Sequence, residues 1–224
     1  MTSERTKGVR TLADLALAEL RQAIISGDLA PGSPVRLQEQ VERLSMSSVP
    51  IREALRLLER SGLVDRSPHK GAQVAEMSAQ DLHETYMIRL ELESMAVRLA
   101  SENMTEDDGT RLLGLMEQYA DASRRDDPSA RDIHAQFHMG LYELSGSKWL
   151  LRLLPMLWDN AERYRRLALP IRGSTEERIE EHKAIVEAAL AGDLDAAEHA
   201  LRLHLSNSFD AAIERLRQQE QGAV

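Results

Sequence analysis

The chain has 224 residues, of which 42% are hydrophobic, and its formal net charge is −9. No apolar run approaches the roughly 18 residues of a membrane span, the N-terminus lacks the apolar stretch of a signal peptide, and the absence of cysteine excludes disulfides and thiolate metal ligands. We therefore expect a cytoplasmic protein without a membrane partner.

The first 75 residues differ from the acidic remainder, with 11 Lys and Arg against 9 Asp and Glu, which suits a nucleic-acid reader. Ser47 or Ser48 can cap a helix here, and Pro50 fits the first turn because a missing N–H costs little there. The expected elements are helices over 11–26, over 36–44 and from about 48 to Gly62, with strands over 63–66 and 72–75. Three helices followed by a hairpin are the plan of a winged helix-turn-helix.

From Ser78 onward, every segment is predicted to be helical. Ser174 with Glu177 forms a capping box, and Asp193 can cap the last helix. The expected helices cover 78–102, 105–125, 130–144, 148–168, 174–192 and 193–218. The predicted fold class is therefore mainly α, with an N-terminal winged helix-turn-helix over 1–76 and a C-terminal antiparallel bundle of about six helices over 77–224.

The stretch SSVPIREALRLLERSGLV, with LRQAIISGDLAPGSPV before it and KGAQV after it, resembles the GntR family of bacterial transcription regulators. The family places a Pro-hydrophobic-Arg-Glu-Ala-Leu run at the start of its recognition helix, and this chain has that run at 50–55. Two positions depart from the pattern, since Ser48 replaces an Arg and Gln40 replaces a Leu. The resemblance implies a DNA-binding domain whose operator binding is weaker or differently selective than the family's.

The recognition helix is expected to carry most of the DNA contacts, because its N-terminal residues meet base edges in the major groove and its free N–H groups favour phosphate. Arg52 can read a guanine through two hydrogen bonds. The predicted DNA-binding residues are Arg36, Ser47, Ser48, Val49, Arg52, Arg56, His69, Lys70 and Gly71. The alternative is that the two arginines of this helix pair with Glu53 and Glu59 on a solvated face.

Four histidines fall on the apolar stripes of three predicted helices in the C-terminal domain. His134 and His138 stand four residues apart, so they stack on one helix face. His182 and His204 lie in phase with apolar residues of two later helices. Imidazoles converging on a bundle core suit a divalent transition metal, with Zn²⁺ or Ni²⁺ expected first. The alternative is that each ring is separately satisfied in the core by its own hydrogen bonds.

By size and helix count, the C-terminal domain resembles the FCD class of effector-binding domains, and its histidines resemble the metal-binding branch of that class. The branch usually carries Asp-x-x-x-His on one helix and one His on each of two later helices, so His134 stands where an Asp is expected. Four neutral imidazoles leave about +2 on a divalent ion, against about +1 with the Asp. A more positive site should hold an anion more strongly, so we expect a small organic acid to bind the metal directly.

Arg89 is the predicted clamp for the far end of that acid, because a guanidinium binds carboxylate through two hydrogen bonds. Its alternative role is a buried salt bridge to Glu93, and both roles are compatible. Asn160 and Asn207 are further candidate effector-binding residues, as hydrogen-bond donors lining the pocket.

Together these features predict a homodimeric transcription regulator, because two half-sites in DNA need two reading heads. Its expected partners are double-stranded operator DNA, a small organic acid effector and a second copy of the chain. The alternative function is a metal-ion sensor in which the ion itself is the signal. An enzyme is not expected, because the sequence has no HExxH motif, no phosphate loop and no nucleophile elbow.

Overall fold

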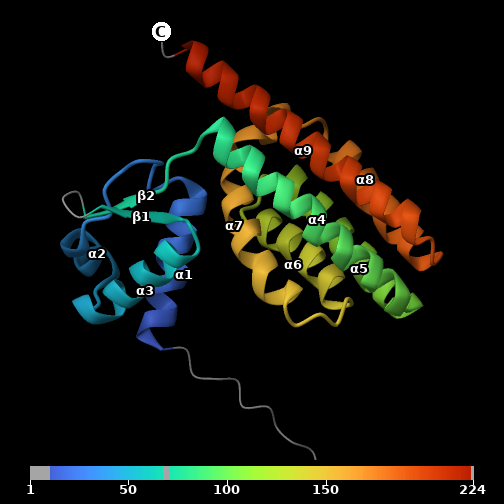
Figure 1. Ribbon diagram of the computed structural model, residues 1–224, viewed down its shortest axis with the longest axis horizontal. Helices are drawn as coiled ribbons and strands as arrows, with labels where there is room; N and C mark the ends of the chain where they lie inside the picture. Colours follow the sequence, from blue (N-terminus) through green and yellow to red (C-terminus); the bar gives the residue numbers. More distant parts are fainter. Residues whose placement is uncertain (1–10, 68–70, 223–224) are drawn as a thin grey trace, which may run out of the picture. The chain divides into compact units, whose positions relative to one another are not determined.

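The computed structural model describes residues 11–67 and 71–222. The chain divides into two units, Met1–Met77 and Ser78–Val224, each with its own hydrophobic core. Helices dominate the described residues (Figure 1), so the predicted fold class is confirmed. Across the same residues, no helix combines the length and the hydropathy that a membrane-spanning segment requires.

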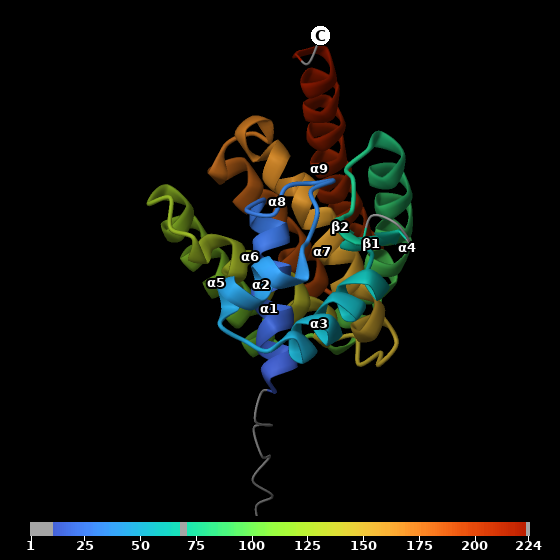
Figure 2. The same ribbon diagram turned by 90° about the vertical axis from the view of Figure 1, so that its left-hand side faces the viewer.

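In residues 11–67 and 71–77, the first unit forms three helices and a two-stranded hairpin, which are labelled in Figure 2. Its elements are α1 (Leu12–Ser26), α2 (Leu37–Leu44), α3 (Ser48–Arg60), β1 (Val64–Ser67) and β2 (Gly71–Val74). Thr11 and Asp14 form a capping box at the start of α1, and Gly27 ends this helix with a φ of 81°, a conformation that a residue without Cβ adopts at little cost. Ser47 is the N-cap residue of α3.

The hairpin is the wing of this unit. Val64 pairs with Val74 in an antiparallel register, and Pro34 bridges to Gln73 on the outer side of β2. The apolar face of α3 packs into the core through fully buried residues such as Ile51 and Leu58. The opposite face of α3 therefore stays exposed, as the predicted DNA-reading role requires.

Over residues 78–222, the second unit is a bundle of six α-helices, as the sequence predicts. Its elements are α4 (Ala79–Asn103), α5 (Glu106–Arg124), α6 (Ser129–Glu143), α7 (Leu150–Ala168), the short 3-10 helix η1 (Leu169–Ile171), α8 (Thr175–Leu190) and α9 (Leu194–Gly222). Helix α9 continues beyond its predicted end near residue 218. No glycine or proline lies between Leu194 and Gly222 to interrupt this helix. The side chain of Gln218 also donates to that of Glu214, one turn earlier, at 2.9 Å.

Helices α4 and α9 lie side by side and antiparallel in the bundle (Figure 1). Arg98 of α4 pairs with Asp195 near the start of α9, and Arg202 further along α9 donates to Glu91 nearer the start of α4. Helix α8 packs on the other side of α9, and α5 packs against both α6 and α8. This arrangement turns the histidine-bearing faces of α6, α8 and α9 toward one interior space.

Candidate functional site

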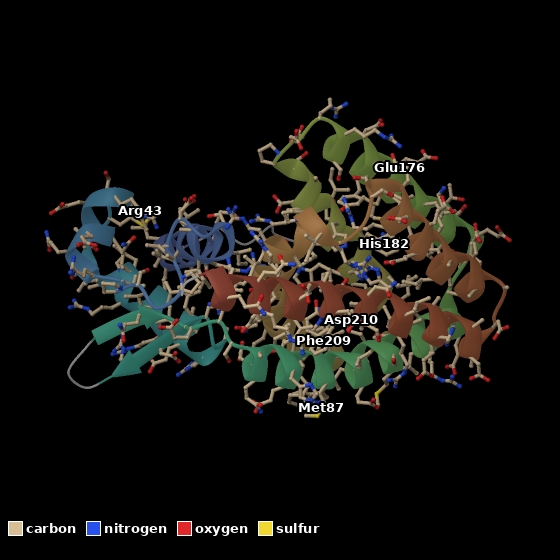
Figure 3. All side chains as sticks on the ribbon, turned by 90° about the horizontal axis from the view of Figure 1, so that it is seen from above. Arg43, Met87, Glu176, His182, Phe209 and Asp210 are labelled. Carbon is tan, nitrogen blue, oxygen red and sulfur yellow. The ribbon has the colours of Figure 1, made fainter. Side chains whose placement is uncertain are left out.

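The four histidine rings meet in the interior of the second unit. One nitrogen from each of His134, His138, His182 and His204 lies within 4.8 Å of the others. The Nε2 atom of His182 is 3.1 Å from that of His134 and 3.0 Å from that of His138. All four rings are buried, and Figure 3 shows His182 among clustered side-chain nitrogens inside the bundle.

Two of the rings are oriented by partners that can only accept a hydrogen bond. Nδ1 of His182 contacts the backbone carbonyl of Arg178, and Nδ1 of His204 lies 2.8 Å from the carboxylate of Glu181. Nδ1 of His182 and Nδ1 of His204 must therefore each carry a proton, which leaves a lone pair on Nε2 of each neutral ring. Burial alone would raise the pKa of Glu181, but hydrogen bonds from His204 and Arg172 lower it to about 2, so this partner is ionised.

The protonation state of the rings suits a metal site. Burial, reinforced by neighbouring positive charge, lowers the pKa of His134, His138 and His182 well below the usual imidazole range, and burial also lowers the pKa of His204. The lowered pKa favours the neutral imidazole, which is the form that binds a transition metal. A transition-metal ion about 2.0–2.1 Å from each nitrogen would leave the nitrogens roughly 3.0–3.5 Å apart, which matches the closest spacings. The residues present thus fit a divalent transition metal.

A small cavity adjoins the rings. It is lined by Arg89, His134, Trp158, Glu162, Arg165 and His204, among others. The space left between these side chains hardly exceeds the size of one water molecule. The side chains that line it already fill most of the space, so a bound molecule must be small or must displace one of them.

Two arginines in the cavity wall are each held by one carboxylate. Arg89 donates to Glu93 at 2.6 Å and lies over the rings of Tyr86 and Trp158, whereas Arg165 pairs with Glu162 at 2.5 Å. Burial alone would lower the pKa of each arginine, but the attraction of its carboxylate outweighs this and raises the pKa above its ordinary value. Both guanidinium groups are therefore charged beside the histidines.

The predicted effector residues occupy different places. Arg89 forms the predicted buried ion pair with Glu93. It also lies in the cavity wall, where the predicted clamp for an acid would have to be. Asn207 instead donates to Glu181 at 2.7 Å, and so supports the partner of His204. Asn160 donates to the carbonyl of Met156 at 2.9 Å. Neither asparagine is among the described residues that line the cavity.

Sequence reasoning missed Arg165, Glu162 and Trp158, which complete the cavity wall from α7. The signal was present, because Trp158, Glu162 and Arg165 recur at helical spacing and so share one face of the helix. From the sequence alone, a charged pair such as Glu162 and Arg165 is predicted to be solvent-exposed. Only the position of α7 against α4 and α9 shows that this face is covered.

The predicted DNA-reading residues of the first unit gather on the exposed side of α3. Val49 is 64% exposed near the start of this helix, and Arg52 donates to the hydroxyl of Ser48 at 2.9 Å instead of pairing with Glu53. Arg56 is also exposed, and Glu59 lies 3.5 Å from Arg66 of the wing.

A groove runs between the wing and α3. Arg36, Arg52 and Gly71 line it, as does Arg66, which sequence reasoning missed. Arg36 pairs with Glu39 at 2.8 Å on the exposed surface. The predicted contacts His69 and Lys70 lie outside the described residues.

Family models match both units of the chain. The model described as "Bacterial regulatory proteins, gntR family" matches residues 12–74, and the model described as "FCD domain" matches residues 84–207. These ranges include the exposed face of α3 and all four clustered histidines.

Individual proteins match over nearly the whole chain. The uncharacterised HTH-type transcriptional regulator BphR of Paraburkholderia xenovorans is 30% identical over 90% of this chain and 85% of its own length. The probable D-xylose utilization operon transcriptional repressor of Paenarthrobacter nicotinovorans is 31% identical over 90% of this chain and 87% of its own. The structure of Escherichia coli McbR/YncC has a TM-score of 0.82 at 26% identity and covers 93% of this chain and 100% of its own.

Proposed function

The chain belongs to the GntR family of bacterial regulatory proteins, with an FCD domain after its DNA-binding head, and from this premise we propose how it is controlled. It is a DNA-binding transcription regulator of this family. We propose that its helical domain holds a divalent transition metal, Zn²⁺ or Ni²⁺, and senses a small organic acid bound beside that ion. Its relatives are regulators rather than enzymes, which supports a sensing role.

The observation that supports this proposal is that candidate metal ligands and arginines line the same cavity. Two of the four candidate metal ligands, His134 and His204, line the same small space as two arginines, the buried Arg89 and the largely buried Arg165. Neutral imidazoles are ligands for a transition metal, and guanidinium groups bind carboxylates through paired hydrogen bonds. A cavity with both along its wall favours a small anion that contacts the metal and an arginine together.

The residues define how such an acid would be held. His134, His138, His182 and His204 would hold the ion, which when bound supplies a Lewis-acidic position for one carboxylate oxygen. A guanidinium has five N–H donors, so Arg89 and Arg165 would each donate to the ligand while keeping their contacts to Glu93 and Glu162. The narrow space between these side chains favours an acid of few atoms.

A thermal-shift screen of short organic acids tests this proposal. At a free acid concentration 100 times its Kd, the free energy of unfolding should rise by about 2.7 kcal/mol, which is a rise in Tm of roughly 5–10 °C for a domain of this size. The rise should disappear after chelator treatment and in Arg89→Gln. An acid that stabilises the chelated protein equally would contradict metal-assisted binding, and a chelator effect without any acid effect would favour the metal-sensor alternative.

We also propose that the regulator acts as a homodimer through the outer surface of α4 and α9. Met87, Ile88 and Met95 of α4 and Leu203 of α9 are each between 44% and 54% exposed, and Figure 3 shows Met87 pointing away from the bundle. Exposed apolar patches of a few hundred Å² mark interaction sites in soluble proteins. The same surface carries Glu91 and Arg202, so a two-fold axis can set opposite charges against each other.

Replacing both Met87 and Met95 with glutamate should dissociate this dimer. Four carboxylates would then face one another across the interface, and such juxtaposition costs several kcal/mol. Sedimentation velocity is expected to show a dimer for the wild type and a monomer for the double variant, with unchanged helix content by circular dichroism. Trp149→Gln, which alters a 69% exposed apolar residue of α7, is the matched control and should stay dimeric. A double variant that remains dimeric would rule out this surface.

A further inference from the structure

We propose that Tyr142 is a positioning residue that fixes the proton of His138 on Nδ1, and that the Arg89–Glu93 ion pair sets the direction of the hydrogen bonds that do so. The inference rests on the proposed metal site and deepens it. It assigns a role to the buried side chains that connect Arg89, in the cavity wall, to His138. His138 is a candidate metal ligand that is not among the residues lining the cavity.

The chain of contacts is continuous and buried. Arg89 donates to Glu93 at 2.6 Å, the hydroxyl of Tyr142 contacts the other carboxylate oxygen of Glu93, and the same hydroxyl lies 3.1 Å from Nδ1 of His138. All four residues are buried, and Tyr142 and His138 are fully so. Water therefore cannot replace any of these partners without opening the core.

The chemistry of these groups allows only one direction of hydrogen-bond donation between them. A carboxylate can only accept, so the single hydroxyl proton of Tyr142 points to Glu93. The Tyr142 oxygen must then accept at its contact with His138, and Nδ1 of His138 must donate. The Nε2 atom of His138 is left as a lone pair, aimed at Nε2 of His182 only 3.0 Å away. This is the tautomer that a metal ligand requires.

Arg89 keeps the direction from reversing. Glu93 is only 1% exposed, and Arg89 donates to both of its carboxylate oxygens, the paired contact that a guanidinium makes with a carboxylate. A neutral acid or an amide at this position could donate to Tyr142, which would then be free to donate its own proton to Nδ1 of His138. The ion pair in the cavity wall therefore controls whether His138 offers its lone pair to the cluster.

The zinc affinity of Tyr142→Phe tests this role, with Zn²⁺ itself as the probe and a competing chelating dye as the readout. Partners that orient a metal-bound histidine typically contribute about 10–100-fold to metal affinity, and a loss of that size is expected here. The matched control is Tyr119→Phe, because Tyr119 packs against His134 while its hydroxyl contacts the side chain of Arg178 and no ring nitrogen. Its zinc affinity should change by less than about threefold.

Two further measurements separate positioning from packing. In metal-free wild-type protein, ¹⁵N NMR of the imidazole nitrogens should show His138 with its proton on Nδ1, a result that needs no variant. In zinc titrations, Glu93→Gln should weaken binding. The Glu93→Gln/Tyr142→Phe double variant should have the same zinc affinity as whichever single variant binds zinc less tightly, because both substitutions act through the Nδ1-protonated tautomer of His138.

Several results would overturn the inference while leaving the proposed metal site intact. A wild-type His138 protonated on Nε2, additive losses in the double variant, or equal losses for Tyr119→Phe and Tyr142→Phe would each do so. Failure of the wild-type protein to bind zinc would instead remove the proposed metal site itself. The two failures are therefore distinguishable in one set of titrations.

Discussion

Replacing His182 with alanine should remove the metal from the protein. Nε2 of His182 lies 3.0 Å from Nε2 of His138 and 3.1 Å from Nε2 of His134, so it takes part in both of these close contacts. Structural zinc sites with four ligands contribute about 10–16 kcal/mol, and an even division gives about 3 kcal/mol for one ligand. That loss corresponds to at least about a hundredfold in affinity. Mass spectrometry of the purified protein should find about one ion per chain in the wild type and little in the variant.

The matched control is His199→Ala, which removes an exposed histidine from the same helix as His204. Its metal content should equal that of the wild type. At a metal concentration 1,000 times the Kd, the free energy of unfolding should rise by about 4 kcal/mol, so chelation should lower Tm by roughly 8–16 °C. Wild-type protein that purifies without metal from metal-containing medium, and that zinc does not stabilise, would favour four separately satisfied core histidines.

Replacing Arg52 with alanine should abolish preferential binding of one DNA sequence. Arg52 stands one turn into α3 on its exposed face, where a hydrogen bond to Ser48 holds the guanidinium at the groove shared with the wing. A bidentate contact to guanine contributes about 1–3 kcal/mol of discrimination, which is roughly a 5- to 150-fold loss of affinity. Fluorescence anisotropy with the sequence that the wild type selects from a random library measures this loss.

The matched control is Arg60→Ala, because Arg60 is an exposed arginine at the opposite end of α3. Its affinity for the selected sequence should fall little, and any loss should be similar on unrelated DNA, as for a phosphate contact. Arg52→Ala should bind unrelated DNA almost as the wild type does. An equal loss on selected and unrelated DNA would show that Arg52 holds phosphate rather than reading a base.

The sequence predicted the helices of both units closely, because their ends are encoded locally. Thr105 and Ser174 each accept a backbone N–H of the helix that follows, and such caps act within four residues. The last helix was predicted too short, because its polar residues near 218 carry no apolar periodicity to mark them as helical. Their own side-chain contacts continue the helix instead.

The meeting of the four histidine rings could also be predicted, because helical periodicity places each ring on an inward face. The second layer around them could not. Tyr142, Glu181 and Arg178 hold ring nitrogens from positions that look like ordinary core or surface residues in the sequence. Their roles depend on distances between helices, and hydrophobic spacing within one helix carries no information about these distances.

The sequence by itself determined the elements, the family and the candidate ligands, because caps, turns and helical phase act over a few residues of chain. The tertiary structure alone decided which polar side chains share an enclosed space. It brought Arg165 of α7 and Arg89 of α4 to the wall beside His134 and His204, and it gave Glu93 a hydroxyl and a guanidinium as neighbours. Burial makes these contacts strong, because a charge removed from water must find its partner within the protein.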